Sequence, residues 1–201
     1  MPPDNDPLQQ QDFFGSPPAP NDRLFFALFP PAATAERLAA LAVQRKTTDH
    51  LAGRPLLTER FHVTLHHVGD FAGLQPGLVE RAMAAAAAVP MAPFDLSFDH
   101  VRSFAGRPGS RPFVLSGQGD GVAGLMAFQQ LLCEALRRHG FAISPRQTFT
   151  PHVTLLYDDK LVPEQAIEPI GWTATEFALI HSLIGKTVHI PLGRWPARAE
   201  G

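Results

Sequence analysis

The chain has 201 residues, and 45% of them are hydrophobic, which is enough for the core of one sizeable domain. The formal net charge of -2 argues against a protein that coats nucleic acid, because such binding needs a basic surface. The single cysteine, Cys133, excludes a disulfide framework and indicates a reducing compartment, so we expect a cytoplasmic protein. The sequence contains neither a run of about 20 apolar residues nor a recognisable signal peptide, so we expect no membrane association.

The charges are unevenly distributed along the chain. The first 22 residues contain no Lys or Arg, and their acidic residues are Asp4, Asp6, Asp12 and Asp22. Because this segment is also rich in Pro and Gln, we predict a disordered tail over residues 1–22 and a single domain over residues 23–201. That domain has 17 basic and 15 acidic residues, a mildly basic balance that suits a short phosphate-bearing ligand.

The first half of the sequence predicts two strands, each followed by a helix. Aromatic and apolar residues form short runs, and Pro30-Pro31 and Pro90 act as stop signals. The predicted elements are a strand over residues 23–29, a helix over 34–46, a loop over 53–58, a strand over 61–68 and a helix over 78–89.

The second half predicts mainly antiparallel strands around one amphipathic helix. In that helix, apolar residues recur at spacings of three and four, and Gly140 follows as a stop signal. The predicted elements are strands over residues 94–104 and 112–116, a helix over 122–139, a strand over 149–156, and a hairpin of 176–184 with 187–192. Helices mixed with antiparallel strands indicate the α+β class.

One short motif occurs twice, ninety positions apart. Phe61-His62-Val63-Thr64-Leu65 is echoed by Pro151-His152-Val153-Thr154-Leu155, whereas random shuffling would give His-Val-Thr-Leu roughly 0.003 times. In a strand, side chains alternate, so each histidine shares one face with its threonine while the apolar residues face the core. Two such strands side by side would surround one small cavity with two imidazoles and two hydroxyls.

This set of side chains suits the opening of a cyclic phosphodiester. A base must take a proton from water, and an acid must protonate the departing ribose oxygen; His62 and His152 can do both near neutral pH. Thr64 and Thr154 can donate hydrogen bonds to the non-bridging phosphate oxygens. The scheme requires no metal or other cofactor.

At these residues the chain resembles the 2H phosphoesterase superfamily, and within it the bacterial RNA 2',3'-cyclic phosphodiesterases, historically called 2'-5' RNA ligases. The resemblance covers roughly residues 23–195, and its carriers are RLFFALFPP, ERFHVTLHHVGD, HVRSF, RPFVLSG, FTPHVTLLYDD, EFALIHSLIG and the closing Trp195. It implies a bilobal, pseudo-twofold α+β fold in which helices flank two antiparallel sheets and a central cleft takes one motif from each lobe.

The resemblance also implies hydrolysis of RNA 2',3'-cyclic phosphate ends to 2'-phosphates, with weak 2'-5' ligation as the reverse reaction. It implies His62 as the proton donor to the leaving 3' oxygen, His152 as the base acting on water, and Thr64 and Thr154 as phosphate ligands. The partners would be RNA ends or small nucleotides that carry a cyclic phosphate, and we expect a monomer.

The sequence departs from the family pattern at two places. After the second motif, Leu156-Tyr157 replaces the Ala-Arg of many relatives, so the cationic phosphate contact is missing there. After the first motif, His66 falls on the same strand face as His62 and Thr64, which predicts that it lines the cleft. We therefore add His66 and Tyr157 to the predicted substrate-binding residues.

Loop arginines form a further candidate contact with RNA. Arg111, together with Arg102 and Arg107 and with Phe104 nearby, could bind an RNA end through charge and stacking, although a solvated loop explains these residues equally well. His139, His181 and His189 have no repeated partner, so a surface or structural role is expected for each.

Three other functions remain open at the level of sequence. The same chemistry could act on a small cyclic nucleotide or an ADP-ribose cyclic phosphate. The fold could bind nucleotides or RNA ends without catalysis, although all four motif side chains are intact. The histidines at 62, 66 and 152 could hold zinc with Asp70, although the spacing of four between the first two suits a helix rather than a strand.

Overall fold

The computed structural model describes residues 19–107, 109–144 and 148–198, so the first 18 residues of the tail predicted over residues 1–22 lie outside them. The strands are β1 (Asp22–Leu28), β2 (Val63–Phe71), β3 (Phe94–Ser103), β4 (Arg111–Ser116), β5 (His152–Asp158), β6 (Gln165–Ala174), β7 (Glu176–Leu183) and β8 (Val188–Pro196). The α-helices are α1 (Ala32–Thr48), α2 (Pro76–Ala87) and α3 (Ala123–Arg138), and short 3-10 turns cover Thr58–Arg60 and Gly119–Val122.

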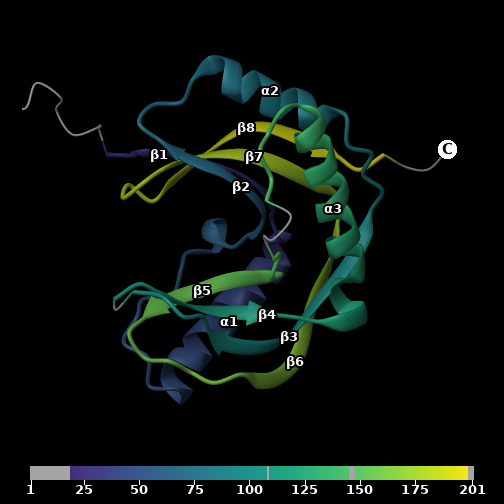
Figure 1. The fold of residues 1–201 in the computed structure, drawn as a ribbon. Coiled ribbons are helices and arrows are strands. Elements are labelled where there is room, and N and C mark those ends of the chain that lie inside the picture. Colours follow the sequence, from purple (N-terminus) through teal and green to yellow (C-terminus); the bar gives the residue numbers. More distant parts are fainter. Residues whose placement is uncertain (1–18, 108, 145–147, 199–201) are drawn as a thin grey trace, which may run out of the picture.

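Within the described residues, the strands form one antiparallel sheet of eight strands in the order β6-β3-β4-β5-β2-β1-β7-β8. The two predicted sheets are its four-stranded halves, which Figure 1 shows splayed apart. Among the described strands, β2 and β5 are the pair that joins the two halves, through Val63 and Val153. The expected bilobal α+β arrangement is confirmed, with the correction that this pairing joins its two sheets into one.

The chain order repeats across the seam between the halves. β1, α1 and β2 follow one another in one half, and β4, α3 and β5 follow one another in the other, so both repeats end on a copy of the motif. α1 packs on β5 and β6 of the opposite half, whereas α3 contacts β2, β3 and α2 (Figure 1). The pseudo-twofold relation therefore places both motifs at the centre of the molecule.

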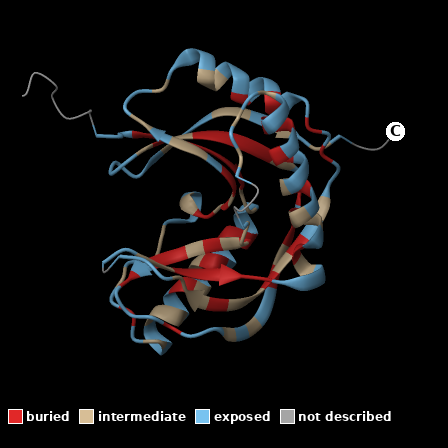
Figure 2. Cartoon of the chain, viewed as in Figure 1, coloured by how far each residue is buried: buried red, intermediate tan, exposed pale blue. Residues whose placement is uncertain are grey.

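The apolar faces of the elements form the core. The predicted stripe on α3 is buried, and its residues are Leu125, Phe128, Leu132 and Leu136. Fully buried aromatic side chains fill the space between the helices and the sheet: Phe26, Phe61, Phe98, Phe113 and Phe177. Figure 2 shows the buried positions gathered on the strands and on the inner faces of the helices. The apolar residues of β2 and β5 belong to this core, which therefore holds the two motifs in place.

The sequence did not predict β6, and the reason is its position. Pro169 and Gly171 interrupt its apolar pattern, but β6 is an edge strand, where a missing backbone N–H is tolerated. β8, at the other edge, contains Pro191 and extends to Pro196, beyond the predicted end at 192. β1 begins at Asp22, a residue that the sequence analysis assigned to the tail.

Among the described residues, no helix is long and apolar enough to span a membrane.

Candidate active site

The two motifs meet at the seam of the sheet. His62 directly precedes β2 and His152 is the first residue of β5, and these two strands are paired through Val63 and Val153. The alternation predicted from the sequence is confirmed, because the apolar residues of both motifs are buried while Thr64 and Thr154 are only half-buried. Both histidines are also half-buried.

All four polar motif side chains line one cavity of about 400 Å³. The remaining wall residues come from β1, β2, β4, β5, β7, β8 and the segment before the first motif: Arg23, Phe25, Leu56, Arg60, His67, Pro112, Tyr157, Ser182 and His189. The predicted convergence of two imidazoles and two hydroxyls is therefore present in the geometry, and the cavity is large enough for a phosphate group with part of a nucleotide.

The two catalytic candidates have matching hydrogen bonds. Nδ1 of His62 lies 2.7 Å from the carbonyl oxygen of Arg60, and Nδ1 of His152 lies 2.7 Å from the carbonyl oxygen of Thr150. Because a carbonyl only accepts, each Nδ1 must carry the hydrogen and donate it. In the neutral rings Nε2 is therefore unprotonated, and it can accept a proton or, once protonated, donate one.

Aromatic side chains support each imidazole. The ring centroids of Phe25 and His62 are 5.1 Å apart, and Phe104 meets His152 edge-on at 4.9 Å. Phe29 adds a second ring beside His62, at 5.9 Å. The hydrogen bond to the backbone and the packed ring together fix the orientation of each imidazole before any ligand binds.

Burial and neighbouring charges lower the pKa of both histidines. For His62, burial is the largest cause and the positive charge of Arg60 adds to it; together they outweigh the hydrogen bond to the Arg60 carbonyl and bring the pKa to about 4. For His152, burial is again the largest cause, and the charge of Arg102 adds to it. Both rings are therefore neutral at pH 7 in the free protein. A bound anion would favour their charged forms.

The structure separates His66 from the catalytic cavity. Phe26 pairs with His66 but Ala27 pairs with Thr64, so β2 contains a bulge at this point and the side-chain alternation changes face. His66 is buried, with Nδ1 3.9 Å from the sulfur of Cys133, whereas His67 lines the cavity instead. His66 therefore lines the adjoining cavity, together with Thr64 and His152, rather than this one, because the bulge interrupts the alternation that the sequence analysis assumed. A contact between His66 and substrate stays a prediction.

Of the other predicted contacts, Tyr157 lines the cavity and Arg111 does not. The Arg111 guanidinium donates to the backbone carbonyls of Gly106 and Asp159, which keep it on the loop beside β4. Arg102 forms a salt bridge to Glu164 at 3.1 Å and packs over the ring of Phe104, so it supports the His152 side indirectly. Arg107 is exposed.

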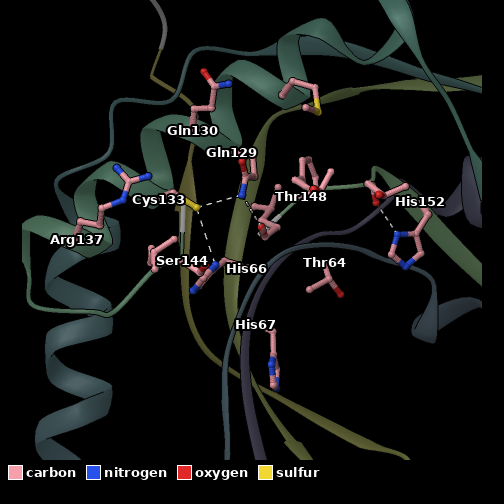
Figure 3. Close-up of a pocket in the computed structure, with 15 residues that line it drawn as sticks. Thr64, His66, His67, Gln129, Gln130, Cys133, Arg137, Ser144, Thr148 and His152 are labelled. Atoms are coloured by element: carbon pink, nitrogen blue, oxygen red, sulfur yellow. Dashed lines mark hydrogen bonds between the residues drawn. The ribbon is translucent and has the colours of Figure 1, made fainter. Parts of the chain in front are cut away.

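A second cavity, of about 490 Å³, adjoins the first and shares Thr64, His67 and His152 with it. In the view of Figure 3, Thr64 and His152 lie toward one end of this cavity, and Cys133 and Arg137 lie toward the other. Many of its other lining side chains are polar, including His66, Gln129, Gln130, Ser144 and Thr148. A ligand held by the motif residues therefore has polar space into which it can extend.

Arg60 and His189 are two of several cavity residues that were not predicted as part of the site. Arg60 lies two positions before His62, and the second copy has Thr150 at the equivalent place, so the repeat gave no indication of it. His189 was expected to have a surface or structural role, but the pairing of β7 with β8 brings it to the cavity, edge-on to His62 at 5.4 Å. Only long-range strand pairing reveals this contact.

The zinc alternative lacks a suitable set of ligands. Of its proposed members, His66 faces Cys133, and Asp70 receives two hydrogen bonds from Arg23. In the part of the chain that the structure describes, no three His, Cys, Asp or Glu residues form a group that could hold a metal ion.

Comparisons with known proteins agree with this geometry. The sequence matches the family model described as the 2'-5' RNA ligase superfamily over residues 29–184. E. coli LigT in its apo form matches with a TM-score of 0.68 and 27% identity, covering 90% of this chain and 100% of that chain. LigT complexed with 3'-AMP matches at 0.66 and 25% over the same shares. A crystal structure titled phosphoesterase matches at 0.67 and 28%, over 89% and 99%.

No curated protein sequence matches the chain significantly. The family match spans well over half of the chain, so the chain belongs to the 2'-5' RNA ligase superfamily. It has the LigT-like fold, and it is a phosphoesterase, as the resemblance predicted.

Proposed function

We propose that this phosphoesterase hydrolyses 2',3'-cyclic phosphates at RNA ends to 2'-phosphates. The observation that carries the proposal is the pairing of His62 with His152 in one cavity, each with Nδ1 bound to a backbone carbonyl. This arrangement leaves two Nε2 atoms for proton transfer, and Thr64 and Thr154 stand beside them as donors. A cyclic phosphodiester needs this combination of a base, an acid and oxyanion contacts.

The reaction follows from these roles. His152 accepts a proton through Nε2 from a water molecule, and the water oxygen forms a bond to phosphorus. The bond from phosphorus to the ribose 3' oxygen breaks, and His62 donates its Nε2 proton to that oxygen. The products are a 3'-hydroxyl and a 2'-phosphate. The two threonine hydroxyls donate hydrogen bonds to the non-bridging oxygens throughout, and ligation through a 2'-5' bond is the weak reverse reaction.

The environment of His62 supports its role as an acid that is charged only in the complex. Its pKa of about 4 keeps the ring neutral in the free protein, since burial disfavours the charged form. A phosphodiester carries a negative charge, which stabilises a protonated imidazole beside it. Substrate binding would therefore raise the pKa of His62 and supply the proton that the leaving oxygen needs.

The adjoining cavity supports a nucleotide as the minimal substrate. With the phosphate between the motif side chains, the polar space beyond Thr64 and His152 can take the attached nucleoside. LigT has been crystallised with 3'-AMP, which is a nucleotide of this size. A small cyclic nucleotide is therefore the second candidate substrate.

The first test is an assay in EDTA with an RNA oligonucleotide that ends in a 2',3'-cyclic phosphate. We expect the wild-type protein to form a 2'-phosphate, and His62→Ala and His152→Ala to be inactive. His100→Ala is the matched control, because His100 is a half-exposed histidine of β3 that bonds to Asp99 and lies outside both cavities.

The outcomes separate the candidate functions. A 3'-phosphate product would contradict the assigned leaving group. Turnover of adenosine 2',3'-cyclic phosphate without turnover of the oligonucleotide would favour a small cyclic nucleotide. Binding of both compounds without turnover of either would favour a protein that binds nucleotide ends without catalysis.

A further inference from the structure

Two arginines line the catalytic cavity, and they differ in their partners. Arg23 is occupied, because its Nε and one terminal nitrogen lie 2.7 Å from the two carboxylate oxygens of Asp70. Arg60 makes no side-chain hydrogen bond or ion pair with any residue that the structure describes, and its Nε and Nη1 are shielded from water. A shielded cation without a partner is costly, so the free protein is incomplete at this point.

His189 has a similar deficiency on the same wall. Its Nδ1 is buried and has no hydrogen-bond partner among the described residues, and its ring meets Phe25 and His62 edge-on, each at 5.4 Å. Arg60, His62 and His189 line the same cavity, and the positive charge of Arg60 lowers the pKa of both histidines. The cavity therefore has an unsatisfied cation and an unsatisfied imidazole nitrogen beside the candidate acid.

We propose that Arg60, with His189 beside it, forms the anion-binding subsite of this cavity and binds the non-bridging oxygens of the substrate phosphate. The inference rests on the proposed function for the identity of the anion, a phosphodiester. Many relatives have an arginine after the second motif, where this chain has Tyr157. The proposal places the cationic phosphate contact at Arg60 instead, two positions before His62. Arg60 thus becomes a substrate-binding residue, and His189 is its polar neighbour in the same cavity wall.

The other side of the cavity does not offer an equivalent contact. Thr150 occupies the position that corresponds to Arg60, and the nearby cation, Arg102, is paired with Glu164 at 3.1 Å. The positive potential of the cavity is therefore concentrated on the His62 side. An anion bound there offsets the charge of Arg60, which removes part of the electrostatic cost of protonating His62.

Inorganic phosphate is a probe that needs no turnover. We expect isothermal titration of the full chain at pH 7 to show that Arg60→Gln weakens phosphate binding by about 10- to 100-fold, the usual range for losing hydrogen bonds to a charged group. Arg60→Lys, which keeps the charge but loses the forked geometry, should bind with intermediate affinity. Arg54→Gln is the matched control, because Arg54 is an exposed arginine of the same loop, and its affinity should equal that of wild type.

A second measurement distinguishes an electrostatic role from a structural one. Removing the charge of Arg60 should raise the pKa of His62 in the free protein, since that charge lowers it, and ring NMR signals titrated against pH report this directly. Phosphate should raise the pKa of His62 further in wild type than in Arg60→Gln. A variant that merely loosened the fold would instead show a lower melting temperature and unchanged coupling to phosphate.

Unchanged phosphate affinity in Arg60→Gln would overturn the subsite, and so would a wild-type protein that fails to bind phosphate at millimolar concentrations. The subsite and the proposed function fail separately. Phosphate binding that depends on Arg60, in a protein that does not open cyclic phosphates, would keep the subsite and reject the reaction.

Discussion

The pH dependence of kcat/KM tests the electrostatics of the site most directly. This parameter reports the protonation of the free enzyme, and the mechanism requires one neutral and one protonated histidine. The pKa of His62 is about 4 and that of His152 lies below its usual value of 6.5. A lowered pKa keeps a base active at more acidic pH, but it also removes the acid at a lower pH. The plot of kcat/KM against pH is therefore bell-shaped, and both its rising and its falling limb lie at more acidic pH than for histidines with the usual pKa.

The optimum of such a profile lies halfway between the two pKa values. Because the pKa of His62 is about 4 and that of His152 is lowered by burial, the optimum of kcat/KM falls on the acidic side of neutrality, and activity decreases about tenfold for each pH unit above the higher pKa. For kcat, which reports the complex, the phosphate charge favours the protonated ring, so the optimum should lie at higher pH.

The assay is steady-state turnover of adenosine 2',3'-cyclic phosphate and of the RNA oligonucleotide, in buffers of constant ionic strength from pH 4 to 9. An optimum of kcat/KM at pH 7 or above would refute the argument from burial. A profile that is flat from pH 5 to 9 would refute catalysis by paired histidines.

Three further predictions concern the phosphate contacts, the loop beside the cavity and metals. Thr64→Val and Thr154→Val should each lower kcat/KM by roughly 10- to 100-fold, since each loses one hydrogen bond to a charged group, and a loss below twofold would exclude that contact. Gly53→Ala should lower the free energy of unfolding by about 1–3 kcal/mol in a urea melt, because its Cβ would lie 2.0 Å from the carbonyl oxygen of Tyr157, whereas Gly77→Ala, with open space, should not destabilise. Incubation with EDTA should leave turnover unchanged; lost activity that zinc restores would favour a metal hydrolase.

The catalytic cavity combines a symmetric pair with an asymmetric wall. The two motif histidines share the same backbone hydrogen bond, the same kind of aromatic support and a lowered pKa. Beside His62, however, lie a third histidine, His189, and Arg60, which has no ionic partner in the described part of the chain, whereas the cation near His152 is paired with Glu164. This difference suits a reaction in which the two histidines carry opposite roles, because identical surroundings would give them identical proton affinities.

The sequence predicted the helices and strands correctly where the spacing of apolar residues alone determines them. The buried stripe of α3 and the apolar faces of both motifs follow from side-chain spacing alone. β6 was missed because Pro169 is unfavourable in a strand unless the strand lies at an edge, and edge position depends on the whole sheet.

The four motif residues could be predicted because a repeat at matching strand positions is visible in the sequence. The faces of His66 and His67 were decided by the register shift between β1 and β2, which single-strand alternation does not contain. Arg60 and His189 have no repeated partner, and they reach the cavity only through a loop and the pairing of β7 with β8. The sequence by itself determined which groups are the candidates for the chemistry. The tertiary structure decided their proton affinities and charged neighbours, because burial and close contact between charges arise only when distant segments pack together.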